Sequence, residues 1–107
     1  MVETPDNRLV RDFHKEMVSV YRAALNECNY RATRFIQMVS KYGGYVAAKR
    51  LLATTSISEG LMRLAECGRL DIAMETLVLR APWSNLFTEQ ELETARSRLV
   101  TLGHQLN

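Results

Sequence analysis

Residues 42–68, YGGYVAAKRLLATTSISEGLMRLAECG, are the stretch that decides the fold. They predict the end of one helix, a corner at Gly43-Gly44, a short helix, a polar turn and another helix that ends at Gly68. Glycine suits both ends because it adopts the left-handed conformation without a steric penalty. Apolar residues recur at helical spacing on both sides of the turn. We therefore expect short helices that pack across one another.

Upstream of this stretch, an amphipathic helix is predicted from Pro5 to Cys28. Thr4 can cap it, and proline suits the first helical position because its missing N–H would be unpaired there anyway. Its apolar residues repeat at three- and four-residue steps: Leu9, Phe13, Met17, Val20, Tyr21, Ala24 and Cys28. A second helix follows Asn29.

Downstream, cap and stop residues predict where the later helices begin and end. Ser and Thr accept from early helical N–H groups, and a Glu three residues on can return a hydrogen bond. Proline disfavours helical geometry in the residue before it. The predicted signals are a capping box of Ser56 with Glu59, a cap at Asp71, a stop at Pro82, a capping box of Thr88 with Glu91 and a stop at Gly103.

Composition is typical of a globular domain, with 47% apolar and 24% charged residues among 107. A chain of this length can bury roughly two-thirds of its unfolded surface. The apolar stripes are too short and too often broken for a coiled coil. We expect an all-α fold, a small orthogonal bundle of five to six helices that forms one domain over residues 1–107.

Cys28 and Cys67 stand far apart, without a Cys-x-x-Cys pair or a histidine cluster beside them. Each ends an apolar pattern, where free cysteine behaves as a small hydrophobe. We interpret both as reduced, with a disulfide as the alternative. The N-terminus lacks a signal-peptide pattern, and no apolar run approaches the roughly 18 residues of a membrane span. These features predict a cytoplasmic protein without membrane contact.

Charge is distributed unevenly along the chain. Residues 28–58 carry five basic and no acidic residues, a net charge of +5, whereas residues 59–107 carry a net charge of −2. The stretch around the polar turn is also similar to a helix-turn-helix, whose second helix would enter a DNA groove. Ser56, Ser58 and Arg63 would then face the bases, although Glu59 and Glu66 on that helix would repel DNA. The candidate nucleic-acid-binding residues are Arg31, Arg34, Lys41, Lys49, Arg50 and Arg63.

Motifs for catalysis, metal binding or cofactor binding are missing from the sequence. His14 and His104 match no metal-ligand spacing, and Gly43-Gly44 lacks the remaining residues of a phosphate loop. We therefore expect no enzyme activity, no catalytic residues, no cofactor and no metal.

Asp71 and Glu75 are an acidic pair at helical spacing that could share a proton or a metal. A cap at Asp71 and an ion pair of Glu75 with Arg69 or Arg80 explain these two residues better.

Several short motifs together resemble one group of proteins. They are DFHKEM (residues 12–17), YRATRFIQM (30–38), GG (43–44), AAKRLL (47–52), GRLD (68–71) with Glu75, LFTEQEL (86–92) and AR (95–96). The combination is similar to small standalone bacterial proteins of about this length, usually labelled uncharacterised. Similar segments occur beside nuclease or restriction-type modules. The resemblance therefore implies a place in phage defence or DNA metabolism and supplies no catalytic residues.

The function expected from these observations is a non-enzymatic helical interaction module. It would act as an accessory or regulatory subunit in a bacterial phage-defence or nucleic-acid-processing context, with a protein partner. The alternative is direct DNA or RNA binding through the basic 28–58 stretch. A homodimer is a further alternative, if Phe35, Trp83 or the first helix leaves an apolar patch uncovered.

Overall fold

A computed structural model describes residues 7–105 of the protein, and the regular secondary structure in this part of the chain is entirely helical. It comprises α1 (Asn7–Cys28), α2 (Thr33–Tyr42), α3 (Gly44–Leu52), α4 (Glu59–Glu66), η1 (Leu70–Ile72), α5 (Met74–Val78), η2 (Trp83–Leu86) and α6 (Glu89–Thr101). The all-α bundle predicted from the sequence is confirmed. The predicted cap at Thr4 and first position at Pro5 lie outside the described residues.

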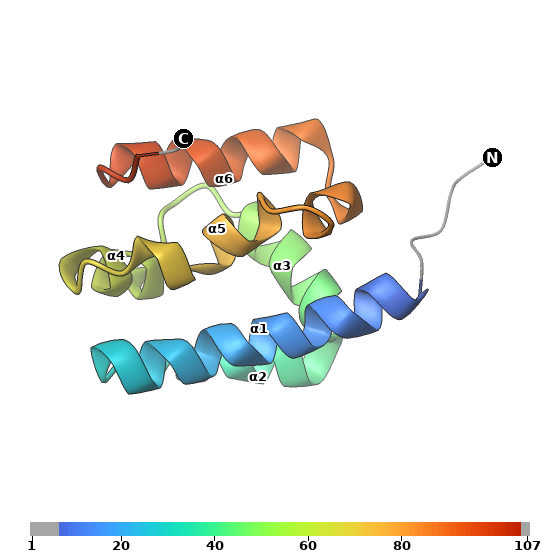
Figure 1. The fold of residues 1–107 in the computed structure, drawn as a ribbon, viewed down its shortest axis with the longest axis horizontal. Helices are drawn as coiled ribbons and strands as arrows, with labels where there is room; N and C mark the ends of the chain where they lie inside the picture. The colour runs from blue at the N-terminus through green and yellow to red at the C-terminus, as the bar shows by residue number, and fades with distance from the viewer. Residues whose placement is uncertain (1–6, 106–107) are drawn as a thin grey trace.

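The helices are arranged around α3, which crosses the middle of the molecule. α1 and α2 lie together on one side, α6 lies on the opposite side, and α3, α4 and α5 fill the space between them (Figure 1). One buried cluster holds α1, α2, α3, α5 and α6 together, and its members include Phe13, Met17, Val39, Ala47, Ala48, Val78 and Ala95. A second buried cluster packs α4 and η1 on the end of α1.

The helices α1 and α3 cross closely at Gly44, because this residue has no side chain to hold their backbones apart. A Cβ atom at this position would lie 2.8 Å from the backbone Cα of His14. The N–H of Gly44 donates to Nδ1 of His14 at 2.9 Å. His14 is thus held at a helix crossing, and the small Ala47 and Ala48 on the same helix are fully buried there.

Most predicted helix ends are confirmed by the backbone. Gly43, Gly68 and Gly103 each have a positive φ after a helix, as their glycine identity predicts. Thr88 and Glu91 form the predicted capping box of α6. Phe87, directly before this capping box, is buried in the main core.

Two predicted caps are wrong. The N-cap of α4 is Ser58, which accepts from the N–H of Leu61, and not Ser56. Asp71 lies in η1 and bonds to Arg69, so α5 begins after Ala73 without a side-chain cap. α5 also ends at Val78, before the predicted stop at Pro82.

The interpretation of the cysteines as reduced is also wrong for this structure. Cys28 at the end of α1 and Cys67 at the C-cap of α4 form a disulfide, with their Cα atoms 5.9 Å apart. The two segments also share an ion pair between Arg69 and Glu27, 3.0 Å long. The two cysteines, 39 residues apart in the sequence, meet because α4 packs against α1.

The helix-turn-helix comparison does not describe residues 44–66. The turn of such a motif has three or four residues, whereas residues 53–58 between α3 and α4 form a six-residue connection. α4 packs on α1 and η1 through Leu61 and Leu64. Ser58 is occupied in capping, so it is not presented as a base-reading residue.

Candidate binding groove

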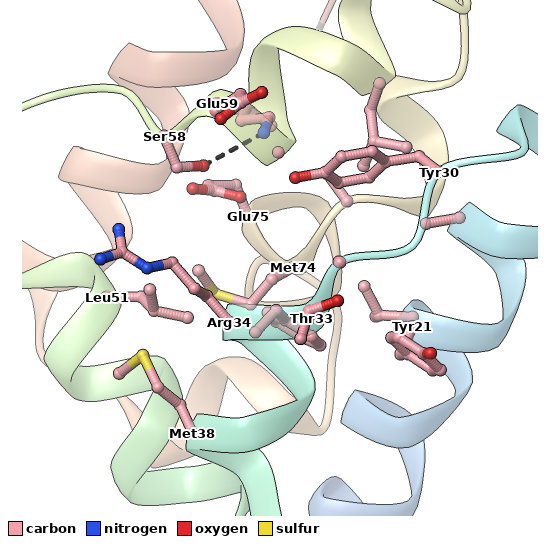
Figure 2. A pocket seen from close by; sticks show the side chains of 18 of the residues that line it. Tyr21, Tyr30, Thr33, Arg34, Met38, Leu51, Ser58, Glu59, Met74 and Glu75 are labelled. Carbon is pink, nitrogen blue, oxygen red and sulfur yellow. Dashed lines mark hydrogen bonds between the residues drawn. The ribbon is translucent and has the colours of Figure 1, made fainter.

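A groove of about 840 Å³ opens between α1 and α2 on one side and α4 and α5 on the other (Figure 2). Its volume falls in the range of roughly 300–1,000 Å³ that is usual for ligand sites. The principal lining side chains are Tyr21, Tyr30, Arg31, Arg34, Met38, Lys41, Tyr42, Leu51, Ser58, Glu59, Met74, Glu75 and Arg98. These residues combine aromatic, apolar and charged groups, and we name this cavity the groove.

Three of the six basic residues predicted from the sequence line the groove directly. Arg34 and Lys41 lie seven residues apart on α2, hence two turns along one face, and Arg31 precedes the helix. All three are exposed. Within residues 7–105, none of them forms an ion pair with a carboxylate. Their charge is therefore available to a ligand in the groove.

Two further predicted residues stack on tyrosines of the groove. The guanidinium of Arg50 lies 4.0 Å from the ring centroid of Tyr42, and that of Arg63 lies 5.2 Å from the ring centroid of Tyr30. Cations within about 6 Å of an aromatic centroid are attracted to the ring face. Arg50 and Arg63 consequently extend the positive surface beyond the lining residues.

Lys49, the sixth predicted residue, lies elsewhere. Its Nζ is 2.7 Å from Oε1 of Glu91, and it lies close to the rings of Tyr45 and Phe87. Burial raises the pKa of Glu91, but hydrogen bonds from Lys49 and from the Thr88 backbone outweigh it and leave the pKa below its ordinary value. Lys49 therefore joins α3 to the start of α6, and it does not share a surface with the other five.

A buried ion pair lies at the floor of the groove. Glu75 of α5 and Arg98 of α6 are 4% and 7% exposed, and Nη1 of Arg98 is 3.2 Å from Oε2 of Glu75. Arg98 also donates to the carbonyl and the hydroxyl of Thr54, at 2.8 and 3.2 Å. Burial raises the pKa of the Glu75 carboxyl, and this effect is partly offset by a hydrogen bond from its own backbone N–H and by the hydrogen bond and charge of Arg98.

The predicted ion pair of Glu75 with Arg69 or Arg80 is therefore wrong. Arg69 binds Asp71 and Glu27, and Glu75 faces the opposite way into the groove. Asp71 and Glu75 also do not form a joint acidic site, because Asp71 is exposed and paired with Arg69. The hydrogen bonds from Arg69 hold the pKa of Asp71 below its ordinary value.

Sequence reasoning missed the floor and the tyrosines of the groove. One signal for the floor was present: Glu75 interrupts the apolar run around Met74, Leu77 and Val78, and Arg98 lies within the apolar stripe of α6. Two opposite charges on apolar faces are expected to meet when both faces are buried. Nothing local indicated that Tyr21, Tyr30 and Tyr42 would line one cavity.

In the described part of the chain, no helix is long and apolar enough to cross a membrane. No group of three or more His, Cys, Asp or Glu side chains that could hold a metal ion occurs among residues 7–105 either. Comparison of the chain with known protein families, with curated proteins and with solved structures finds no match.

Proposed function

We propose that this protein is a non-enzymatic helical binding module whose groove holds a segment of single-stranded nucleic acid. The observation that carries the proposal is the position of five cations on or beside a cavity lined by three tyrosines. Proteins that bind single strands combine a positive groove, which follows the phosphates, with aromatic rings on which bases stack. The proposal keeps direct nucleic-acid binding and narrows it to Arg31, Arg34, Lys41, Arg50 and Arg63.

The spacing of the cations supports a strand more than a single anion. Arg34 and Lys41 are two helical turns apart on α2, about 10 Å at 1.5 Å per residue. Phosphates of an extended strand are several ångströms apart, so two such cations can contact different phosphates of one segment. Tyr21 of α1 and Tyr30 of the α1–α2 connection line the same cavity (Figure 2), where exposed bases could stack.

The primary experiment is a fluorescence anisotropy titration of end-labelled single-stranded DNA, single-stranded RNA and duplex DNA at several salt concentrations. Contact with three to five phosphates gives a slope of about −2 to −3.5 for log K against log [salt] with single strands. We expect single strands to bind with such a slope and to bind more tightly than the duplex. Flat titrations at low salt would refute the proposal.

Two charge-reversal variants test the groove itself. Arg34→Glu with Lys41→Glu changes the lining, and Arg11→Glu with Lys15→Glu makes the same charge change on exposed residues of α1 outside the groove. The groove variant should bind more weakly and lose about 1.4 from the salt slope, because two phosphate contacts are removed. An equal loss in both variants would mean that net charge, and not the groove, attracts nucleic acid.

A tyrosine pair tests base stacking in the same way. Tyr30→Leu removes a ring from the groove, whereas Tyr45→Leu removes one that packs on Phe87 outside it. Loss of one stacked base costs about 1–3 kcal/mol, roughly 5- to 150-fold in affinity. Only the groove variant should show this loss, provided that circular dichroism finds both folded.

The wider setting belongs to the proposal as well. We place the module as an accessory or regulatory subunit, with a protein partner, in bacterial phage defence or nucleic-acid processing, on the basis of the sequence resemblance. A bound oligonucleotide that stays intact on a denaturing gel tests the non-enzymatic part. Affinity capture from the native host tests the protein partner, and size-exclusion chromatography with light scattering tests the homodimer.

The last part of the proposal is a cytoplasmic location. The disulfide argues for a different location, because disulfides persist mainly in oxidising compartments. Rapid alkylation of cysteines in intact host cells decides between the two. Free thiols at Cys28 and Cys67 support the cytoplasm, and blocked thiols contradict it.

A further inference from the structure

We propose that Glu75 recognises the exocyclic amino group of one base held on the floor of the groove, so that the protein prefers amino-bearing bases to uracil. This inference rests on the proposed function, because it names the chemistry that the same groove selects. It arises from a different observation: an acceptor group lies at the bottom of a cavity whose sides carry cations.

One oxygen of the Glu75 carboxylate receives no hydrogen bond from another side chain of the described residues. Arg98 binds Oε2 at 3.2 Å, and no other side chain of the described residues donates to this carboxylate. Fully buried polar side-chain atoms without a partner are lacking in the described residues. Glu75 lines the groove, although the residue as a whole is only 4% exposed.

The surroundings make this oxygen selective. Met38, Leu51 and Met74 give the cavity apolar surface, and Figure 2 shows Glu75 reaching into it from α5 and Arg34 from α2. An ionised carboxylate only accepts hydrogen bonds, and Arg98 fixes its position. A base that presents N–H₂ toward it gains a bond, whereas a base that presents a carbonyl leaves two acceptors facing each other.

The polarity of the groove matches a nucleotide. The cations at Arg31, Arg34 and Lys41 suit a phosphate, and the tyrosine rings suit the flat face of a base. The carboxylate suits an amino group, as in the pairing of Glu with N4 of cytosine. All three kinds of group line one cavity.

The first test uses the wild-type protein and two probes, oligo(dC) and oligo(dU) of equal length. Both carry the same phosphates and sugars, and cytosine presents an amino group at position 4 where uracil presents a carbonyl. We expect oligo(dC) to bind about 5- to 10-fold more tightly, which corresponds to a discrimination at the lower end of base-edge contacts. Equal affinities would overturn this inference and leave the proposed function intact. Absence of binding to both would overturn the proposed function itself.

The second test converts the acceptor into a donor. In Glu75→Gln the amide oxygen can keep the hydrogen bond from Arg98, so the NH₂ group takes the position that faces the groove. The preference for oligo(dC) should then disappear or reverse. Glu66→Gln, an exposed residue of α4 outside the groove lining, is the matched control and should retain the preference.

A Glu75→Gln protein that retains the wild-type preference would overturn the assignment. If this variant fails to fold by circular dichroism, the wild-type comparison of the two homopolymers remains decisive.

Discussion

Removal of the Cys28–Cys67 disulfide should cause one of the larger stability changes available in this chain. The cross-link joins residues 39 apart, so it closes a loop of about 40 residues in the unfolded state. The loop-entropy relation gives about 4 kcal/mol for a loop of this size at 25 °C. Domains of this kind have a total stability of about 5–15 kcal/mol. Reduction should therefore leave the fold marginal.

The assay is urea unfolding followed by far-UV circular dichroism, with and without a reductant, for the wild type and for Cys28→Ser with Cys67→Ser. With m of about 1–3 kcal/mol/M, the midpoint of the wild type should fall by roughly 1.3–4 M on reduction. The double variant should unfold at the lower midpoint under both conditions. The Arg69–Glu27 ion pair and the packing of Leu61 and Leu64 persist without the bond, so the native state should stay helical.

Coincident midpoints would refute this reasoning if a thiol assay confirms that the untreated protein has no free thiols. Such a result would mean that the bond forms but does not restrict the unfolded chain. Free thiols in the untreated protein would instead show that the pairing does not form in solution.

Three smaller predictions follow from single contacts. Thr88→Ala removes the hydroxyl that accepts from the N–H of Glu91, and should cost about 1 kcal/mol in urea unfolding, whereas Thr101→Ala at the far end of α6 should cost much less. Gly44→Ala places a Cβ 2.8 Å from the His14 backbone and should destabilise by about 1–3 kcal/mol through overpacking, unlike Ala53→Ser at the exposed end of α3. The hydrogen bonds from Arg69 lower the pKa of Asp71 below 3.8, so its stabilising effect is present above that pH and is lost as the pH falls through the folded-state pKa. The stability difference between the wild type and Asp71→Asn should therefore shrink on acidification, and a difference that stays constant would contradict this account.

The helices could be predicted from the sequence because their signals are local. The Thr88–Glu91 capping box and the glycines at positions 43, 68 and 103 act within a few residues of themselves. The Ser56 prediction failed for a related reason. Ser56 and Ser58 both offer a hydroxyl, and the choice between them follows from how Leu61 and Leu64 of α4 pack.

The side-chain pairings that sequence reasoning missed for Cys28 and Lys49 join distant parts of the chain. Cys28 meets Cys67 across 39 residues, and Lys49 meets Glu91 across 42. Composition indicates the basic stretch as a candidate, but only the packing of α3 on α6 separates Lys49 from Arg34 and Lys41. Charge counted along a sequence therefore identifies candidates, and the helix crossings decide which of them share a surface.

The Glu75–Arg98 pair is the feature whose purpose stability alone does not explain. Breaking a buried pair costs about 3–5 kcal/mol, yet replacing both partners with apolar residues is often neutral or stabilising. The Arg98→Met variant should accordingly have a much lower free energy of unfolding in urea than the wild type, because the substitution leaves the Glu75 carboxylate buried without its partner. Glu75→Leu with Arg98→Met should recover most of that loss while abolishing any preference for oligo(dC). If the double variant is as unstable as Arg98→Met, the ion pair stabilises the contact of α5 with α6. A structural role would then account for its position at the floor of the groove without a ligand.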